Sequence, residues 1–497
     1  KKSEYYFELP FVQGVDKNNI KKNDCRVQQY AQMGAYIVQN CQLLIALWNG
    51  INDNLQGGTS FIVNFQINGI PEDYKKDNNP FSNIETGPVY HILTPRKKDN
   101  SIPNDISSAQ YIYPNFWRKD IQNRLKVNKF INVEPEINKS ASKYYDNLFK
   151  RFNNLNQDVF RNTKYLSKTS HKSKEQLINL ETAKYSNENL EIVTNYFSIF
   201  DTLALKFKKK RDFALRLILL LIVLSVLCFQ MYLEFIKHPL VLFFYPLSLV
   251  FSITLYKLVK FFEYDKKHED YRSIAESLRV HFYWSFSGVL DNVLDHYLHK
   301  HRGELEWIRK CIRNIQIVSN SDFDYKNIVD SLKINQINLT LKYWIKSQAD
   351  WFFVNGNYFY LKSKSYDRYS LVFFALGLIN SFLLLFLSIF FNITDIIAGV
   401  TVGGLHHFLV VSIGLSIAMF AVLKGYQDKM VFSELSKQYI RMSNLYKSAN
   451  KAIEKHLDAF DQNNTYQILT KVGEEALIEN ADWILKHRSH SIELPYG

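Results

Sequence analysis

Four long apolar segments constrain this chain more than any other feature of its sequence. They occupy residues 213–233, 239–259, 370–392 and 397–423. Each is about as long as the ~20 residues that a helix needs to cross the apolar core of a bilayer. Short connections join the first to the second and the third to the fourth, so we expect two transmembrane hairpins. The mean hydropathy of the whole chain is −0.20, which predicts that most other residues face water.

Basic residues lie beside these segments. They precede the first and third segments and follow the second and fourth. In the connections inside the hairpins, residues 234–238 have one basic residue of the Lys or Arg type, Lys237, and residues 393–396 have none. The positive-inside rule therefore predicts that both hairpins start and end in the cytoplasm, together with both termini of the chain. The same placement makes anionic lipid, rather than nucleic acid, the expected partner of the net charge of +13.

The sequence offers no catalytic group and no metal centre. Its four cysteines are scattered without CxxC spacing, which argues against a disulfide scaffold or a zinc site. His296, His299 and His301 lie close to Asp295 in sequence, but no convincing further ligand follows, so we expect a surface cluster. The sequence also contains no Walker loop and no Ser-His-Asp arrangement.

The N-terminal part has the pattern of an α/β domain. Apolar residues at helical spacing predict a helix over 26–40, and the continuous apolar run 43–48 predicts a strand buried on both faces. We expect further strands at 5–9 and 88–93, and a helix that begins at Thr59. This order of strand, loop, helix and strand predicts a parallel, doubly wound sheet.

The loop after the strand 43–48 has the features of a phosphate-binding turn. Glycines let a backbone approach a ligand closely, and a helix N-terminus offers free N–H groups and a partial positive charge. Ligands of open parallel sheets lie beyond the carboxyl ends of the strands. The candidate ligand-binding residues are Trp48, Asn49, Gly50, Gly57, Gly58, Thr59, Thr94 and Arg96.

Three of these candidates have a stated role. Trp48 would stack on a base, Thr59 would contact a phosphate, and Arg96 would pair with a phosphate bidentately. The alternative is structural: Gly57 and Gly58 make a tight turn, Thr59 caps a helix, and Trp48 belongs to the core.

The stretch LLIALWNG, followed by GGTSFIV, resembles the SLOG superfamily of Rossmann-like domains, whose members read roughly LLIALWDG and GGTADVV. GPVYHILTPR resembles a later strand of that domain. The resemblance covers about residues 5–97 and implies a domain that senses or processes nucleotides. Asn49 and Phe61 stand where the pattern has acidic residues, and no carboxylate follows the glycine turn, where LOG-type phosphoribohydrolases place a glutamate. This departure favours sensing over hydrolysis.

The stretch YRSIAESLRV at 271–280 resembles the cytoplasmic helices of bacterial SLOG-fused membrane proteins, and WIKSQ at 344–348, before a helical hairpin, is similar to SLATT-type two-span effectors. This resemblance implies a role in anti-phage or other conflict systems, at the inner membrane, as a channel or a membrane-disrupting protein. Polar residues inside the spans either line a pore or form hydrogen bonds between helices. These candidates are Asn380, Ser381, Ser388, His406 and His407.

The expected fold is a Rossmann-like α/β domain joined to a mainly α membrane region with four transmembrane helices and long cytoplasmic helices. We expect a nucleotide-sensing domain at 1–130, a helical connector at 131–212, a hairpin at 213–260, a helical region at 261–365, a second hairpin at 366–425 and C-terminal helices at 426–497. The chain starts with Lys rather than Met, so we expect that it is a fragment or has lost an N-terminal segment. The resemblance to SLOG domains implies a first strand and its glycine turn upstream of residue 1.

The leading function is a membrane effector gated by a nucleotide second messenger, either a cyclic nucleotide or an ADP-ribose derivative. Four spans are too few to surround an ample pore, so a homo-oligomer in the lipid bilayer is expected. No other cofactor is expected. One alternative is a membrane-tethered enzyme that cleaves a nucleotide or an N-glycosidic bond, and another is a membrane scaffold.

Overall fold

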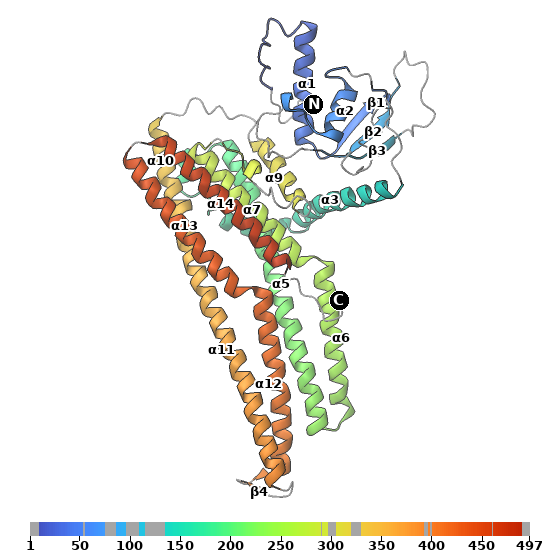
Figure 1. Ribbon diagram of the computed structural model, residues 1–497, viewed down its shortest axis with the longest axis vertical. Coiled ribbons are helices and arrows are strands. Elements are labelled where there is room, and N and C mark those ends of the chain that lie inside the picture. The colour runs from blue at the N-terminus through green and yellow to red at the C-terminus, as the bar shows by residue number, and fades with distance from the viewer. Residues whose placement is uncertain are drawn as a thin grey trace. The chain divides into compact units, whose positions relative to one another are not determined.

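The computed structural model describes residues 9–52, 55–74, 86–95, 109–114, 135–289, 291–296, 305–319, 330–391, 396–397, 400–459 and 461–489. The chain divides into two compact units (Figure 1). The α/β unit consists of residues 1–165 and 294–325, and the membrane unit consists of residues 166–293 and 326–497.

The α/β unit contains a small mixed sheet. Its elements are α1 (Asn23–Asn40), β1 (Leu44–Trp48), α2 (Thr59–Asn68), a 3-10 turn (Glu72–Tyr74), β2 (Val89–Leu93) and β3 (Ala109–Ile112). The strands β1 and β2 are parallel, with Leu44 opposite Val89 and Trp48 opposite Leu93, and β3 is antiparallel to β2. The predicted helix at 26–40, the strands at 43–48 and 88–93 and the helix start at Thr59 are confirmed.

The sheet differs from the predicted one in two respects. In the described part of the α/β unit the sheet has three strands, and β3 is antiparallel to its neighbour. The described residues therefore do not show a doubly wound parallel sheet. The predicted strand at 5–9 lies almost entirely outside the described residues.

Helix α2 covers one face of this sheet. Ala46, Trp48 and Val89 pack against Val63 and Ile67 of α2. On the other face of β1, Ile45 and Leu47 are 62% and 64% exposed. The prediction that β1 is buried on both faces was therefore wrong for the described part of the chain. A run of apolar residues shows that a strand can be covered, but it does not show which element covers it.

Two further helices complete the α/β unit: α3 (Pro135–Arg161) and α9 (Glu306–Ser319), the latter preceded by the short α8 (Val293–His296). The Arg313 guanidinium of α9 donates a 2.6 Å hydrogen bond to the Gln39 carbonyl at the end of α1. The Trp307 ring of α9 meets Phe152 of α3 edge-on, with centroids 6.0 Å apart. Residues far along the chain thus pack against the N-terminal helix.

The membrane unit is almost wholly helical. Its described elements are α4 (Thr163–Lys174), a 3-10 turn (Thr182–Tyr185), α5 (Glu188–Glu234), α6 (Pro239–Phe261), α7 (Tyr264–Ser287), α10 (Asp330–Thr340), a π-helical segment (Leu341–Lys346), α11 (Ser347–Phe390), the short antiparallel strands β4 (Ile396–Ile397) and β5 (Val400–Thr401), α12 (Val402–Met430), α13 (Phe432–Asp458) and α14 (Gln462–Ser489). Four helices are long and apolar enough to cross a membrane, and they include α5, α6, α11 and α12. The described residues therefore have apolar helices at the four predicted positions, paired as two hairpins, and these helices fit a membrane location.

The membrane unit repeats one architecture. In the first repeat α5 runs into the first span, α6 returns, and α7 folds back along α5, where Phe200 meets Tyr271. In the second, α11, α12 and α13 follow the same course. The joint between the returning span and the next helix is Glu263 (φ 54°) in one repeat and Val431 (φ 50°) in the other. These are the only two non-glycine residues with positive φ in the described chain, so the joints match in backbone geometry as well as in position.

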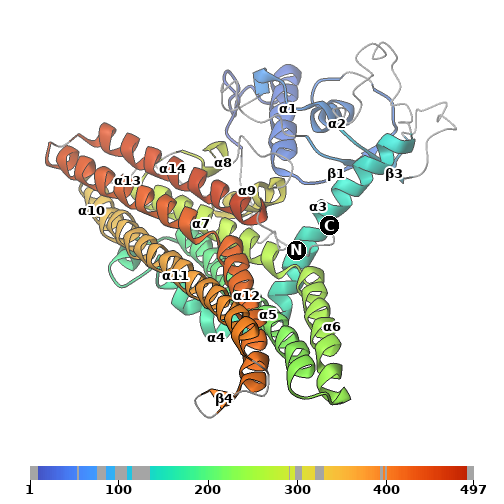
Figure 2. The ribbon, with the colours of Figure 1, turned by 60° about the horizontal axis from the view of Figure 1, so that its bottom comes forward.

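The four spans lie in the order α11, α12, α5, α6 (Figures 1 and 2). Substantial contacts join α11 to α12, α12 to α5 and α5 to α6. The helices α6 and α11 therefore stand at the two ends of a row, and the hairpins meet through α12 and α5.

Candidate functional site

The predicted ligand loop lies where the carboxyl ends of the parallel strands β1 and β2 meet the N-terminus of α2. Trp48 ends β1 and is only 3% exposed. Its indole Nε1 donates to the Ile51 carbonyl at 2.9 Å, and its own carbonyl accepts from the Thr94 amide at 2.8 Å. The ring therefore belongs to the core, as the structural alternative expected, and the Trp48 carbonyl links the ends of the two strands.

The glycines of the loop have different roles. Gly50 and Gly57 have φ values of 79° and 75°, in the region that favours glycine. A Cβ at Gly57 would also lie 2.9 Å from the Val27 carbonyl oxygen of α1. Gly58 has an ordinary extended conformation, with φ −77° and ψ 169°, and is the N-cap of α2. The expected cap at Thr59 was wrong, because Thr59 is the first helical residue.

The N-terminus of α2 has no side-chain cap, since Gly58 has no side chain. The first amide groups of a helix lack partners within the helix, and the helix dipole adds partial positive charge there. Asn49, on the facing strand end, is 8% exposed, and its side-chain oxygen accepts from the Ile51 amide at 3.2 Å. The loop thus places a glycine-rich backbone and a helix N-terminus at one edge of the sheet, which suits an anion.

The residues after β2 are only partly described. The Thr94 hydroxyl donates to the Ile92 carbonyl at 3.2 Å. Arg96, the predicted phosphate ligand, lies outside the described residues.

A buried imidazole lies beside this loop that the sequence analysis missed. His91 of β2 is 1% exposed, its ring centroid is 5.2 Å from that of Trp48, and its Nε2 is 2.9 Å from the Trp48 carbonyl oxygen. Its Nδ1 has no hydrogen-bond partner among the described residues. A polar residue in the middle of the apolar strand PVYHIL was the signal that could have identified it.

A cavity of about 540 Å³ lies elsewhere in the α/β unit, along the outer side of α1. Leu9 and the α1 residues Tyr30, Met33 and Ile37 line much of it. This lining is mainly apolar, and the cavity runs toward Cys41 at the amino end of β1 rather than into the glycine loop. It therefore does not coincide with the predicted phosphate site.

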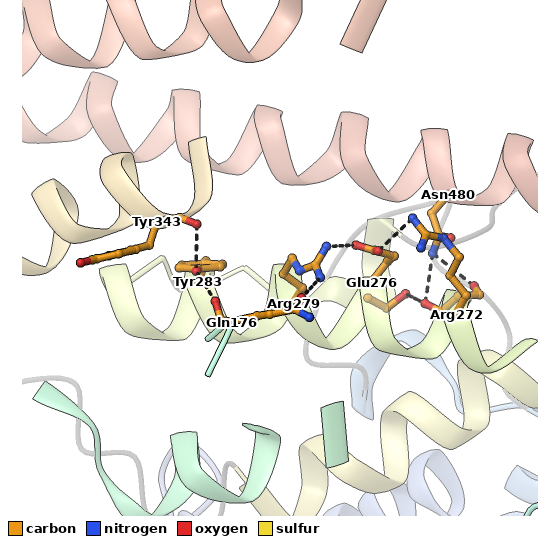
Figure 3. A network of polar contacts seen from close by, with 9 residues as sticks. Gln176, Arg272, Glu276, Arg279, Tyr283, Tyr343 and Asn480 are labelled. Atoms are coloured by element: carbon orange, nitrogen blue, oxygen red, sulfur yellow. Dashed lines mark hydrogen bonds and ion pairs between the residues drawn. The ribbon is translucent and has the colours of Figure 1, made fainter. Parts of the chain in front are cut away.

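A polar network connects the helices of the membrane unit that lie outside the four spans (Figure 3). Glu276 of α7 pairs with Arg272 at 3.2 Å and with Arg279 at 2.6 Å. Arg279 also donates to the side chain of Gln176, just after α4, at 3.0 Å. Arg272 lies between two tryptophan rings, those of Trp351 and Trp483, at 5.8 and 5.5 Å from their centroids.

The same network extends to two other helices (Figure 3). The Tyr283 hydroxyl donates to the Tyr343 carbonyl in the π-helical segment at 3.2 Å. The Asn480 amide of α14 donates to the Ser273 carbonyl at 3.1 Å. Helix α7 is thereby bonded to α14, to the segment before α11 and to the residues after α4.

A second charged cluster joins α7 to α14 nearer the spans. Arg488 of α14 is 2.5 Å from Asp270 and 3.5 Å from Glu269. Burial raises the pKa of Glu269 to about 8, and the neighbouring Arg488 only partly opposes this effect. Glu269 is therefore largely protonated at neutral pH.

The polar residues of the spans have ordinary partners. The Asn380 amide of α11 donates to the Ser412 hydroxyl of α12 at 2.8 Å, so it bonds one helix of the hairpin to the other. Ser381 and Ser388 donate to carbonyls one turn earlier in their own helix, at 2.7 and 2.8 Å. His406 and His407 lie near the start of α12, at the end of the span.

Comparison of the chain with protein-family models, with curated proteins and with solved structures finds no match. The fold alone therefore defines its class: a protein with four helices that fit a membrane location, and a small α/β unit.

Proposed function

We propose that this chain is a membrane effector gated by a nucleotide-derived ligand. The observation that carries the proposal is the strand–loop–helix turn of the α/β unit. In that turn the uncapped N-terminus of α2 stands at the carboxyl edge of two parallel strands. This is where nucleotide phosphates bind in α/β proteins. The resemblance of the same residues to SLOG domains supports a nucleotide, and the SLATT-like segments support a bacterial defence role.

The membrane unit supports coupling between soluble helices and spans. Helix α5 is one continuous helix of 47 residues and α11 is one of 44, and each runs from the soluble core into its span. The network around Glu276 and the cluster around Glu269 bind α7 and α14 together beside them. A rearrangement of these helices would move the spans as rigid rods. A ligand drives such a change only when it binds the open and the closed conformation with different affinities.

The row of four spans supports assembly of several copies. In the described part of one copy the two hairpins meet mainly through α12 and α5, and α6 and α11 stand at the ends of the row. We propose that copies associate in the bilayer through these end helices and surround a conducting or disruptive opening together. The basic residues beside the spans support a cytoplasmic location for both termini and for the helices outside the spans.

The test is leakage of dye or ions from liposomes that contain the purified full chain. A panel of cyclic nucleotides and ADP-ribose derivatives is added, and the nucleotides are analysed by HPLC afterwards. We expect one ligand to trigger leakage and to remain intact. Consumption of a ligand without leakage would refute the proposal and favour a membrane-tethered enzyme.

A pair of variants at Gly58 tests the ligand site. Its backbone conformation suits any residue, and Asn and Asp are both good N-caps, so Gly58→Asn and Gly58→Asp should both fold. The aspartate adds a negative charge where the phosphate would bind, whereas asparagine has nearly the same shape without charge. We expect the aspartate variant to lose ligand-triggered leakage much more than the asparagine variant. Full ligand-triggered leakage of both variants would exclude the N-terminus of α2 as the ligand site.

A further inference from the structure

A cluster of metal-ligating side chains lies where α5 ends and α12 begins, away from the ligand loop and the two charged clusters. Glu234 is the last residue of α5, and His406 and His407 are near the start of α12. One ligand atom from each of the three side chains lies within 4.8 Å of the others. His407 Nδ1 and Glu234 Oε2 are 2.5 Å apart.

From this geometry we infer that Glu234, His406 and His407 bind a divalent transition-metal ion of the Zn²⁺ class. Two imidazoles and one carboxylate are a common three-ligand set for zinc, with Zn–N and Zn–O distances of about 2.0–2.2 Å. Ligand atoms of a tetrahedral site are then about 3.3 Å apart. The 2.5 Å between His407 and Glu234 is shorter than this value, and all three atoms lie within 4.8 Å of one another, so side-chain rotations can bring them to coordinating positions.

Packing of the two helices fixes where these side chains stand. A Cβ at Gly414 of α12 would collide with the Gln230 side chain of α5, so the helices approach closely one turn before Glu234. The Thr401 hydroxyl accepts from the Gly404 amide at 3.2 Å and fixes the start of α12. The ligands therefore come from backbones that are held together without the metal.

Exposure and charge also favour a cation. The side chain of His407 is 47% exposed and that of Glu234 is 18% exposed, so the cluster is open at the surface of the protein. With neutral imidazoles the cluster carries the single negative charge of the carboxylate. Imidazole and carboxylate together suit zinc better than they suit calcium or magnesium, which prefer oxygen ligands.

The metal would join the two repeats. Glu234 belongs to the first hairpin, and both histidines belong to the second. A bound ion would therefore lock α5 to α12 at the hairpin ends distant from the soluble helices. This inference does not depend on nucleotide binding or on channel activity.

The test uses the full chain in detergent micelles, stripped with a chelator and then titrated with ZnCl₂. Zinc retained per chain is measured by atomic emission after desalting, and the melting temperature is followed in parallel. We expect one zinc ion per chain that depends on this cluster, and a rise in melting temperature on loading, because a ligand that binds only the folded state stabilises it.

Three variants and one control decide the outcome. Glu234→Gln, His406→Ala and His407→Gln should each lower the zinc affinity about 10-fold or more, since loss of supporting groups alone costs 10–100-fold. The control is His456→Ala, which removes another histidine–carboxylate pair, 3.3 Å from Asp461. Melting temperatures without zinc show that each variant folds. Equal zinc binding by the wild type and the three cluster variants, or no zinc binding at all, would mean that the cluster is an ion pair only.

Discussion

Replacing Glu269 by glutamine should stabilise the membrane unit, and the gain should grow with pH. Glu269 is 3% exposed, and burial raises the pKa of its carboxyl group from 4.5 to about 8. The carboxylates of Asp265 and Asp270 raise this pKa further, whereas the cations of Arg488 and Lys429 lower it. Glutamine keeps the size and hydrogen-bonding capacity of the protonated acid and cannot ionise.

The sign and the size of the effect follow from linkage. Below pH 4.5 the carboxyl group is protonated in the folded and in the unfolded chain, so it adds no pH dependence. Between pH 4.5 and about 8 the unfolded chain has lost this proton and the folded chain has kept it, so the stability of the wild type falls as the pH rises. Each pH unit of this window is worth about 1.4 kcal/mol, and the whole window amounts to about 5 kcal/mol.

The assay is thermal unfolding in detergent, followed by tryptophan fluorescence from pH 5 to pH 9. Trp284 and Trp344 are fully buried in this unit and report its unfolding. We expect the melting temperature of Glu269→Gln to match that of the wild type near pH 5 and to exceed it by about 10 °C at pH 9. The control Glu175→Gln, at an exposed glutamate of the same unit, should follow the wild type throughout. Parallel curves for Glu269→Gln and the wild type, or a less stable variant at pH 9, would refute the reasoning and show that an ionised Glu269 holds Arg488.

The remaining predictions concern packing, pH and the spans. Gly473→Ala should destabilise the membrane unit by about 1–3 kcal/mol, because its Cβ would collide with the buried Trp284 ring. A Cβ at Gly425 of α12 would meet open space, so Gly425→Ala should stabilise the membrane unit by up to about 1 kcal/mol. Equal melting temperatures for the two variants would contradict this pair of predictions. His281 is 4% exposed, and burial lowers its pKa from 6.5 to about 4, so the stability of the wild type should fall as the pH drops through that window. In a pH series of melting temperatures, His281→Asn should weaken this fall. Asn380→Ala should weaken the second hairpin by about 0.6 kcal/mol, measured by unfolding in mixed micelles, and a loss several times larger would mean that Asn380 does more than bond α11 to α12.

The sequence predicted the elements whose cause is local. Segments of about 20 apolar residues favour long helices that fit a bilayer, and four such helices, paired as two hairpins, were found where the spans were expected. The helix at 26–40 and the strands at 43–48 and 88–93 followed from the spacing and length of apolar runs. Their parallel pairing followed from the helix between them.

The candidate nucleotide site was predictable only in part. The glycine-rich turn and the start of α2 could be read from Gly57, Gly58 and Thr59, because turns depend on local backbone freedom. Whether the Trp48 ring is free or buried depends on Val63 and Ile67 of α2, which pack on it. The antiparallel β3 was not expected, since four residues with no strong alternation have no clear pattern of their own.

The sequence by itself determined four helices long and apolar enough to cross a membrane and a small α/β region, because hydrophobic length and periodicity are properties of neighbouring residues. Only the tertiary structure decided which distant side chains meet. Arg313 bonds to Gln39 across 274 positions, and His407 meets Glu234 across 173. Contacts of this kind depend on how helices pack in three dimensions, and no local pattern in one sequence encodes that packing.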